Sequence, residues 1–266
     1  MIGGKFKRKQ AKLSPSQAKS RAWFFTWLDV LAIGAWGILM LRYWLTGKLN
    51  LLIHPDYFWL VISGGIGLLI IASSKAWQLL RQRRSSKGAI VQHVTLFPPG
   101  MSSSLLLITA IMGLTFTPRV FASQTALDRG VTDSLGATRA QPQAFRSARN
   151  PEERSLLDWV RTLNVYPEPD AYAGQRAKVQ GFVIHPPELP PDYILISRFV
   201  ITCCAADAYP VGLPVKLSTS RQAYPPDTWL EVEGTMATDT LVGKRQLTIQ
   251  ATSLKPIAEP ENPYEY

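Results

Sequence analysis

Two adjacent cysteines, Cys203 and Cys204, are the side chains of this sequence best suited to do chemistry, and no other cysteine accompanies them. They end an apolar run and stand shortly before Asp207. Thiolates bind soft or borderline metal ions such as zinc, and a carboxylate can complete a zinc site. If the chain turns helically after Cys203, that residue and Asp207 share one face. His185 is a further candidate ligand, although nothing in the sequence brings it close.

Two other interpretations of the cysteine pair remain open. One is a redox-active pair, whose disulfide would be strained because adjacent Cα atoms lie only about 3.8 Å apart, whereas ordinary disulfides need about 4.4–6.8 Å. The other is two small buried side chains with no ligand, a common fate of free cysteine. The sequence holds no phosphate-binding loop, nucleophile elbow or H-E-x-x-H motif. We therefore expect a protein that is not an enzyme.

The elements that must position the cysteines form a predicted β domain over residues 150–258. Five runs rich in branched and aromatic residues are separated by Pro and Gly clusters, which indicates strands. They are 177–185, 193–202, 213–218, 229–236 and 246–254. The tripeptide Val-x-Gly occurs twice, ending at Gly181 and at Gly234. Glycine inside a strand marks a bulge or a tight bend. We expect a small all-β barrel that resembles an OB-fold, with an open sandwich as the alternative.

A short helix should precede this barrel. Asn150 is a suitable N-cap, Pro151 suits the first turn, and the two glutamates that follow favour the positive end of the helix dipole. The segments on either side of the domain are expected to carry no regular structure. Residues 122–149, rich in Ser, Thr, Ala, Gln and Arg, read as a flexible linker, and residues 259–266 read as a C-terminal tail.

Three apolar stretches lie between a basic tail, residues 1–22, and the predicted linker. They cover about 23–45, 57–80 and 102–120, and each is near the ~20 residues that a helix needs to cross a bilayer. In hydrocarbon, a helix is the conformation that satisfies the backbone groups of a single stretch. Three transmembrane α-helices are therefore predicted over 23–121.

The charges around these stretches predict their orientation. Residues 1–149 carry 19 Lys and Arg against 4 Asp and Glu, and the positive charges gather in the tail and in the loop after the second stretch. By the positive-inside rule both segments lie in the cytoplasm, which places everything after Ala122 outside the plasma membrane. The alternative is cleavage after Val120-Phe121-Ala122, which loosely resembles a signal-peptide site.

Charge also bears on the partners of this chain. Residues 150–266 carry 10 Lys and Arg against 15 Asp and Glu, and such a domain repels the phosphates that dominate nucleic-acid binding. The expected partner of the basic half is the lipid bilayer, not nucleic acid. Within the spans, Asp29 is a candidate for contact with another helix, because a carboxylate is costly in hydrocarbon. Arg42 and Lys75, near span ends, should reach the interface by snorkelling.

The segment Ser197–Val215, SRFVITCCAADAYPVGLPV, resembles the YcgQ-like family of bacterial permease subunits, with further support from Ala173-Gly174-Gln175 and Leu157-Asp158-Trp159. The order of apolar spans, linker and terminal domain is similar as well. The resemblance implies an accessory subunit of a two-component permease, whose partner is a separate multi-span membrane protein. It implies no substrate, and no established role for the cysteine pair or Asp207.

The leading hypothesis is thus an accessory permease subunit whose outer domain presents or gates a substrate, such as a metal ion. A membrane-tethered thiol oxidoreductase and a structural assembly factor without a ligand are the two alternatives.

Overall fold

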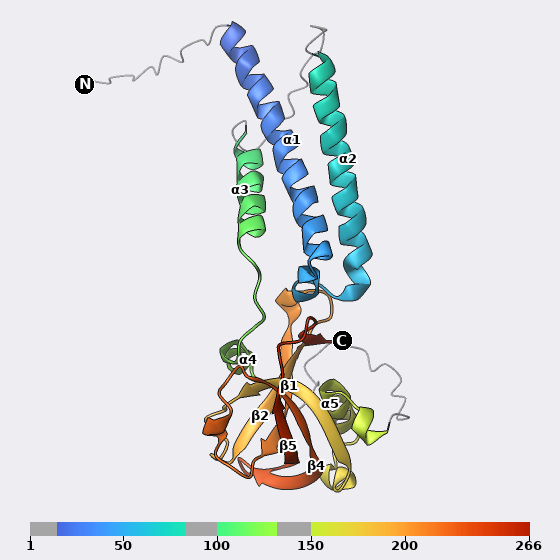
Figure 1. The fold of residues 1–266 in the computed structure, drawn as a ribbon, viewed down its shortest axis with the longest axis vertical. Coiled ribbons are helices and arrows are strands. Elements are labelled where there is room, and N and C mark those ends of the chain that lie inside the picture. Colours follow the sequence, from blue (N-terminus) through green and yellow to red (C-terminus); the bar gives the residue numbers. More distant parts are fainter. Residues whose placement is uncertain (1–14, 83–99, 132–149) are drawn as a thin grey trace, which may run out of the picture. The chain divides into compact units, whose positions relative to one another are not determined.

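The computed structural model describes residues 15–82, 100–131 and 150–266, which divide into two compact units (Figure 1). The first unit consists of helices α1 (Pro15–Leu45), α2 (Phe58–Gln82) and α3 (Met101–Thr115). The second unit joins the loop Gly47–Phe58 to residues from Pro118 onward. The loop between the first two helices therefore belongs to the same unit as the β domain.

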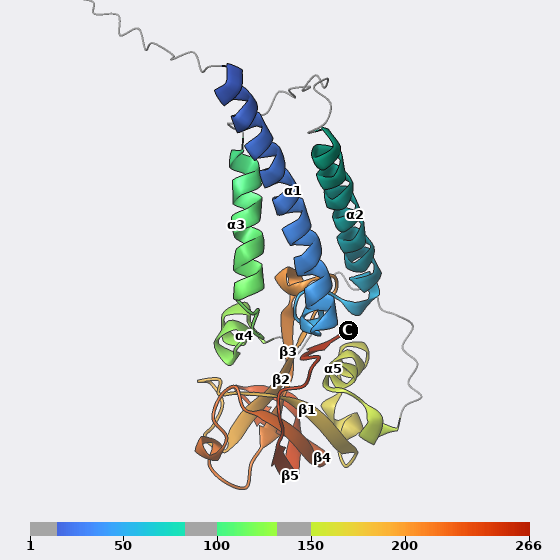
Figure 2. The same ribbon diagram turned by 45° about the horizontal axis from the view of Figure 1, so that its top comes forward.

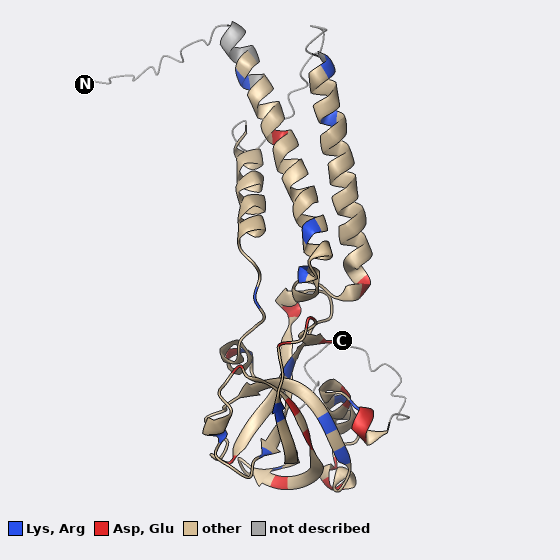
Figure 3. Ribbon diagram, viewed as in Figure 1, with Lys and Arg blue, Asp and Glu red and all other residues tan. Residues whose placement is uncertain are grey.

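Two helices of the described residues are long and apolar enough to cross a membrane. These segments are Trp23–Leu45 and Pro55–Arg81, which agree with the first two predicted spans. Their long uncharged stretches are visible in Figure 3. Large apolar side chains of α2, including Trp59, Ile70 and Trp77, are exposed. This apolar surface suits contact with lipid rather than with water.

Helix α3 is shorter than the predicted span over 102–120. It ends at Thr115 and has 15 residues, a length of about 22 Å. The helix cannot continue easily because Pro118 disfavours the helical conformation of the residue before it. Side chains of α1 satisfy the carbonyl groups left free at this end: Arg42 donates to the carbonyl of Leu114 at 2.9 Å, and the Tyr43 hydroxyl to that of Gly113 at 2.6 Å. Arg42 thus caps a neighbouring helix instead of only snorkelling.

Small residues let the three helices approach closely. A Cβ added to Gly37 of α1 would lie 2.9 Å from the side chain of Leu69 in α2. A Cβ added to Gly113 of α3 would lie 2.9 Å from the side chain of Leu39 in α1. Helix α1 therefore packs against both of its neighbours through glycine contacts, a common arrangement in membranes.

The β domain is a mixed six-stranded sheet. Its strands are β1 (Arg176–Ile184), β2 (Tyr193–Val200), β3 (Tyr209–Lys216), β4 (Trp229–Leu241), β5 (Lys244–Pro256) and β6 (Tyr264–Glu265). The sheet order is β1-β4-β5-β3-β2-β6, and β1 also pairs with β2. This extra pairing joins the first five strands into a closed ring. All pairs in the ring are antiparallel except β3 with β5.

Both predicted strand glycines lie where two strands meet closely. A shift in the pairing of β4 with β5 falls between Glu233 and Gly234, so the expected bulge is present there. A Cβ added to Gly181 would lie 2.5 Å from the carbonyl oxygen of Ser197 on β2. Gly181 is thus the point at which β1, already paired with β4, also approaches β2.

Helix α5 (Leu156–Val165) covers one end of the strand ring. Its buried residues Leu156, Leu157, Trp159 and Val160 share a core with side chains from strands β1 to β5. The helix begins later than predicted: residues Pro151–Glu153 form only a 3-10 turn. Ser155 is the N-cap instead of Asn150, in a reciprocal capping box with Asp158. A capping box satisfies two free amide groups, which explains why the helix starts there.

Two segments expected to lack structure are part of the β domain. Residues 123–129 of the predicted linker form helix α4 (Ser123–Arg129), in which Ala126 is fully buried against the domain. Helices α4 and α5 lie on different sides of the strands in both views of Figures 1 and 2. Residues 264–265 of the predicted tail form β6, which pairs in parallel with β2. Linker residues 132–149 and the basic tail up to residue 14 lie outside the described residues.

Candidate functional site

The cysteine pair lies just beyond the end of strand β2. The strand stops at Val200, so the alternation of side chains across a strand no longer applies to Cys203 and Cys204. Both cysteines are free, Cys203 is exposed and Cys204 is half-buried. Their Sγ atoms lie 3.6 Å apart. The structure thus brings the two thiols together at the surface, which excludes the interpretation of both as buried core residues.

Asp207 closes the turn that holds the thiols. It ends a 3-10 turn over Ala205–Asp207, for which Cys204 is the N-cap. Its carboxylate accepts hydrogen bonds from the backbone N–H of Cys203 at 2.8 Å and of Thr202 at 3.2 Å. Partial burial opposes the charged form, but these bonds and one from the Cys203 thiol outweigh it, so the pKa of Asp207 falls below its ordinary value. Asp207 therefore stays charged and fixes the turn.

The loop Gly47–Phe58 forms the other side of this site. Ile53 and Cys204 make an antiparallel β-bridge. The backbone N–H of His54 donates to the carbonyl of Cys203 at 3.0 Å, and the N–H of Ala205 donates to the carbonyl of Leu52 at 2.8 Å. The cysteine turn is therefore paired on both sides of Cys204 with a loop about 150 residues earlier in the chain.

The end of the chain holds the same loop. The Tyr264 hydroxyl donates to the carbonyl of Leu51 at 3.2 Å, and the ring of Tyr266 meets the ring of His54 edge to face, with centroids 4.4 Å apart. These loop and terminal residues were not identified from the sequence. The one local signal was His54-Pro55-Asp56, in which His54 caps a 3-10 turn over Pro55–Tyr57.

Protonation distinguishes the possible chemistries of the pair. The hydrogen bond from the Cys203 thiol to Asp207, with a smaller effect of Cys204, raises the pKa of Cys203 to about 11. Reactive cysteines have the opposite property, a lowered pKa that makes the thiolate available at neutral pH. The raised pKa of Cys203 therefore disfavours a thiol oxidoreductase.

The described residues do not form a complete metal site by themselves. Among residues 15–82, 100–131 and 150–266, no three His, Cys, Asp or Glu side chains are grouped to hold a metal ion. His185 lies elsewhere in the β domain, with its Nε2 atom 2.8 Å from the carbonyl oxygen of Tyr224. A structural zinc site usually has four protein ligands. A soft ion at the cysteine pair would consequently need ligands from its own coordination shell or from a partner.

The raised pKa of Cys203 makes a direct prediction about thiol reactivity. In a Cys204→Ala background the smaller contribution of Cys204 is lost, but the hydrogen bond to Asp207 remains, so the midpoint for alkylation of Cys203 by iodoacetamide should still lie above the ordinary thiol pKa of about 8.5. At pH 8 the thiolate should therefore be scarcer, and alkylation slower, than for a thiol of ordinary pKa. Asp207→Asn removes the negative acceptor and should lower the midpoint and speed alkylation at pH 8, as followed by mass spectrometry.

Asp56→Asn is the matched control for that experiment, because Asp56 is an exposed acid of the adjoining loop. It should leave the alkylation profile unchanged. A midpoint at or below pH 8.5 in the Cys204→Ala protein would contradict the hydrogen bond between Cys203 and Asp207.

Asp29, the fourth predicted site residue, lies in the other unit. Its Oδ1 atom accepts a hydrogen bond from the Ser103 hydroxyl, which joins α1 to α3. The carboxylate is thus provided with a polar partner from its own chain. This contact needs no second protein.

The second polar centre of the β domain is a buried ion pair that the sequence did not predict. The guanidinium of Arg198 and the carboxylate of Glu265 lie 3.6 Å apart, with only 14% and 10% of their side chains exposed. Glu265 also accepts hydrogen bonds from the Ser155 hydroxyl and the Leu157 backbone, both at 2.8 Å. Burial lowers the pKa of Arg198, and the nearby Glu265 opposes that shift. The pair fastens the chain end to the start of α5.

These features define a class: a small β domain with an exposed vicinal dithiol, attached to apolar helices. Residues 152–266 match the DUF1980 C-terminal domain family. The match includes both cysteines, Asp207 and the Arg198–Glu265 pair, and it includes neither the apolar helices α1 to α3 nor the loop Gly47–Phe58. A comparison with curated proteins found no match to the chain.

Proposed function

We propose that this protein is the accessory subunit of a two-component membrane permease, anchored by its apolar helices and acting through its outer β domain. The observation that carries the proposal is the pairing of the loop Gly47–Phe58 with the cysteine turn. That loop connects α1 to α2 along the chain. The thiols are thus tied to the segment at which the chain turns back into the membrane, where a permease subunit would meet substrate.

The same pairing supports a membrane topology. A loop that follows one span and precedes the next is on the far side from the N-terminus, and the β domain that shares its hydrogen bonds must be on that side too. The positive charges of the N-terminal tail and of the loop after α2 favour the cytoplasm for both. We therefore infer three spans, with α3 as the shortest, and an extracytoplasmic β domain.

The strand order supports an OB-like classification of the domain. OB-folds are five-stranded Greek-key barrels, and here five strands close through β1–β2 and β3–β5 pairings. Such barrels bind diverse ligands, so the fold alone does not fix the function.

Three helices are too few to enclose a pore, so transport requires a partner with more spans. The exposed apolar side chains of α2 are available to such a partner as well as to lipid. In this complex the dithiol of Cys203 and Cys204 contacts the substrate, for which a soft metal ion is the best chemical match. Because binding would displace a thiol proton, affinity should increase with pH.

Purification from native membranes tests the proposal. The tagged full-length chain, extracted in a mild detergent, should elute in a constant ratio with one multi-span permease. The variant Cys203→Ala/Cys204→Ala should retain that complex and lose support of transport, because the cysteines contact substrate and not the partner. Repeated recovery of the chain alone, in a form that still supports transport, would contradict the subunit assignment.

A further inference from the structure

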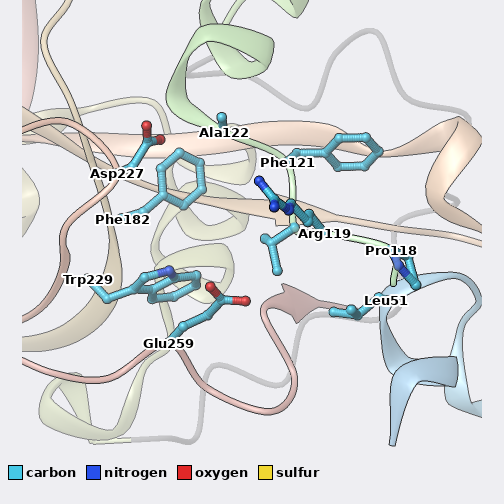
Figure 4. Close-up of a pocket in the computed structure, with 10 residues that line it drawn as sticks. Leu51, Pro118, Arg119, Phe121, Ala122, Phe182, Asp227, Trp229 and Glu259 are labelled. Atoms are coloured by element: carbon cyan, nitrogen blue, oxygen red, sulfur yellow. The ribbon is translucent and has the colours of Figure 1, made fainter. Parts of the chain in front are cut away.

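A hollow in the β-domain unit, separate from the cysteine turn, has the composition of a ligand site. Its volume is about 390 Å³, within the range of small-molecule sites. Strands β1 and β4, Leu51 of the loop Gly47–Phe58, the segment before α4 and the chain after β5 all line it (Figure 4). All of these parts lie in a single unit, so the hollow does not depend on the placement of the helices.

Aromatic rings form the apolar wall of the hollow. Phe182 and Trp229 meet edge to face with centroids 5.8 Å apart, and Phe182 also stacks on Phe199 at 5.5 Å. Phe121, across the hollow, packs on the same Phe199 at 5.2 Å. Since these rings are fixed by one another, the wall exists without a ligand.

Asp227 lines the hollow, but its carboxylate already has a hydrogen-bond partner. Its carboxylate accepts a hydrogen bond from the backbone N–H of Ser123, at the start of α4. Its φ angle is 68°, a left-handed conformation that few non-glycine residues adopt. The turn after Pro226 therefore holds Asp227 in place to cap α4, and this carboxylate is not free for a ligand.

Two opposite charges in the hollow have no partner among the described residues. Arg119 and Glu259 are exposed, and neither side chain has a hydrogen bond or an ion pair with any described residue. In Figure 4 the guanidinium of Arg119 and the carboxylate of Glu259 both point into the hollow. A cation and an anion that share a hollow without pairing can each bind the opposite charge of one ligand.

We propose that this hollow binds a free amino acid with a large apolar side chain. The ligand carboxylate pairs with Arg119, the ammonium pairs with Glu259, and the apolar side chain occupies the space along the aromatic wall. This inference does not rest on the permease assignment, because it concerns binding by the β domain alone.

Calorimetry of the full-length chain in mild detergent tests the proposal with three probes that share one apolar body. L-Phenylalanine carries both charges, 3-phenylpropionate lacks the ammonium, and phenethylamine lacks the carboxylate. L-Phenylalanine should bind at least about tenfold more tightly than either analogue, because each charged hydrogen bond that is lost weakens binding by that factor or more.

Two variants test which charged group of the ligand binds Arg119 and which binds Glu259. Arg119→Gln should weaken L-phenylalanine about tenfold or more and leave phenethylamine unchanged, and Glu259→Gln should weaken L-phenylalanine and leave 3-phenylpropionate unchanged. Arg176→Gln, an exposed arginine outside the hollow, is the control and should change nothing. The proposal is overturned if L-phenylalanine gives no binding heat, if the three probes bind equally, or if neither variant alters its affinity.

Discussion

Replacing Glu265 by alanine is expected to destabilise the β domain by about 3–5 kcal/mol, because it leaves a buried guanidinium without its anion. Glu265 is 9% exposed and is held by Arg198, by the Ser155 hydroxyl and by the Leu157 backbone. It also places a negative charge at the N-terminus of α5, where the helix dipole favours one. In a domain of this size the melting temperature should fall by roughly 10–20 °C.

The matched control is Glu233→Ala. Glu233 forms a shorter ion pair, 2.7 Å from the Lys178 nitrogen, but both side chains are about half exposed. Water and salt screen such pairs, so the melting temperature of the full-length chain should change little. Equal effects of the two substitutions would contradict a buried anchor. No effect of Glu265→Ala would mean that residues 259–266 are a solvated tail after all.

The strands of the β domain could be predicted because their pattern is local. Five runs are rich in branched and aromatic residues, and Pro and Gly separate the runs, so each strand is recognisable by itself. Even Gly234 indicated its bulge. The helix start was misplaced because Asn150-Pro151 and Ser155 both suit an N-cap, and the capping box of Ser155 with Asp158 and the buried contacts of Leu156 and Leu157 favour the second.

Strand β6 and helix α4 could not be predicted because their stability comes from distant residues. Tyr264 and Glu265 are too few to show any periodicity, and they pair with β2, about 65 residues earlier. The first turn of α4 depends on the Asp227 carboxylate, about 100 residues away in sequence. No nearby residue indicated either contact.

Only part of the candidate site could be predicted, because some of its contacts come from residues that are distant in the sequence. The sequence suggested that Cys203 and Asp207 share a face if the chain turns after Cys203, and in the structure the Asp207 carboxylate accepts a hydrogen bond from the backbone N–H of Cys203. Their residue types did not indicate that Asp207 would raise the thiol pKa, because that requires a hydrogen bond whose geometry only the fold defines. The partner loop could not be inferred, since backbone groups of Leu52 and His54 make its contacts and backbone groups have no sequence signature.

The second large effect expected is a disulfide between that loop and the cysteine turn. Ile53 and Cys204 are partners in an antiparallel bridge, in which Cα atoms lie about 4.5–5.5 Å apart. Ordinary disulfides span about 4.4–6.8 Å, so Ile53→Cys should bond to Cys204 without moving the backbone. The substitution is made with Cys203→Ala, so that Cys204 has one possible partner within the chain.

Oxidation of this variant in native membranes tests most directly whether the loop between the first two helices and the cysteine turn form one site on one side of the bilayer. We expect nearly complete disulfide formation within a single chain, detected as a reducible mobility shift and as a linked peptide by mass spectrometry. The control Asp56→Cys, an exposed position of the same loop outside the bridge, should give little of this product. Absence of a disulfide between the thiol introduced by Ile53→Cys and Cys204, or its formation only between chains, would contradict the account.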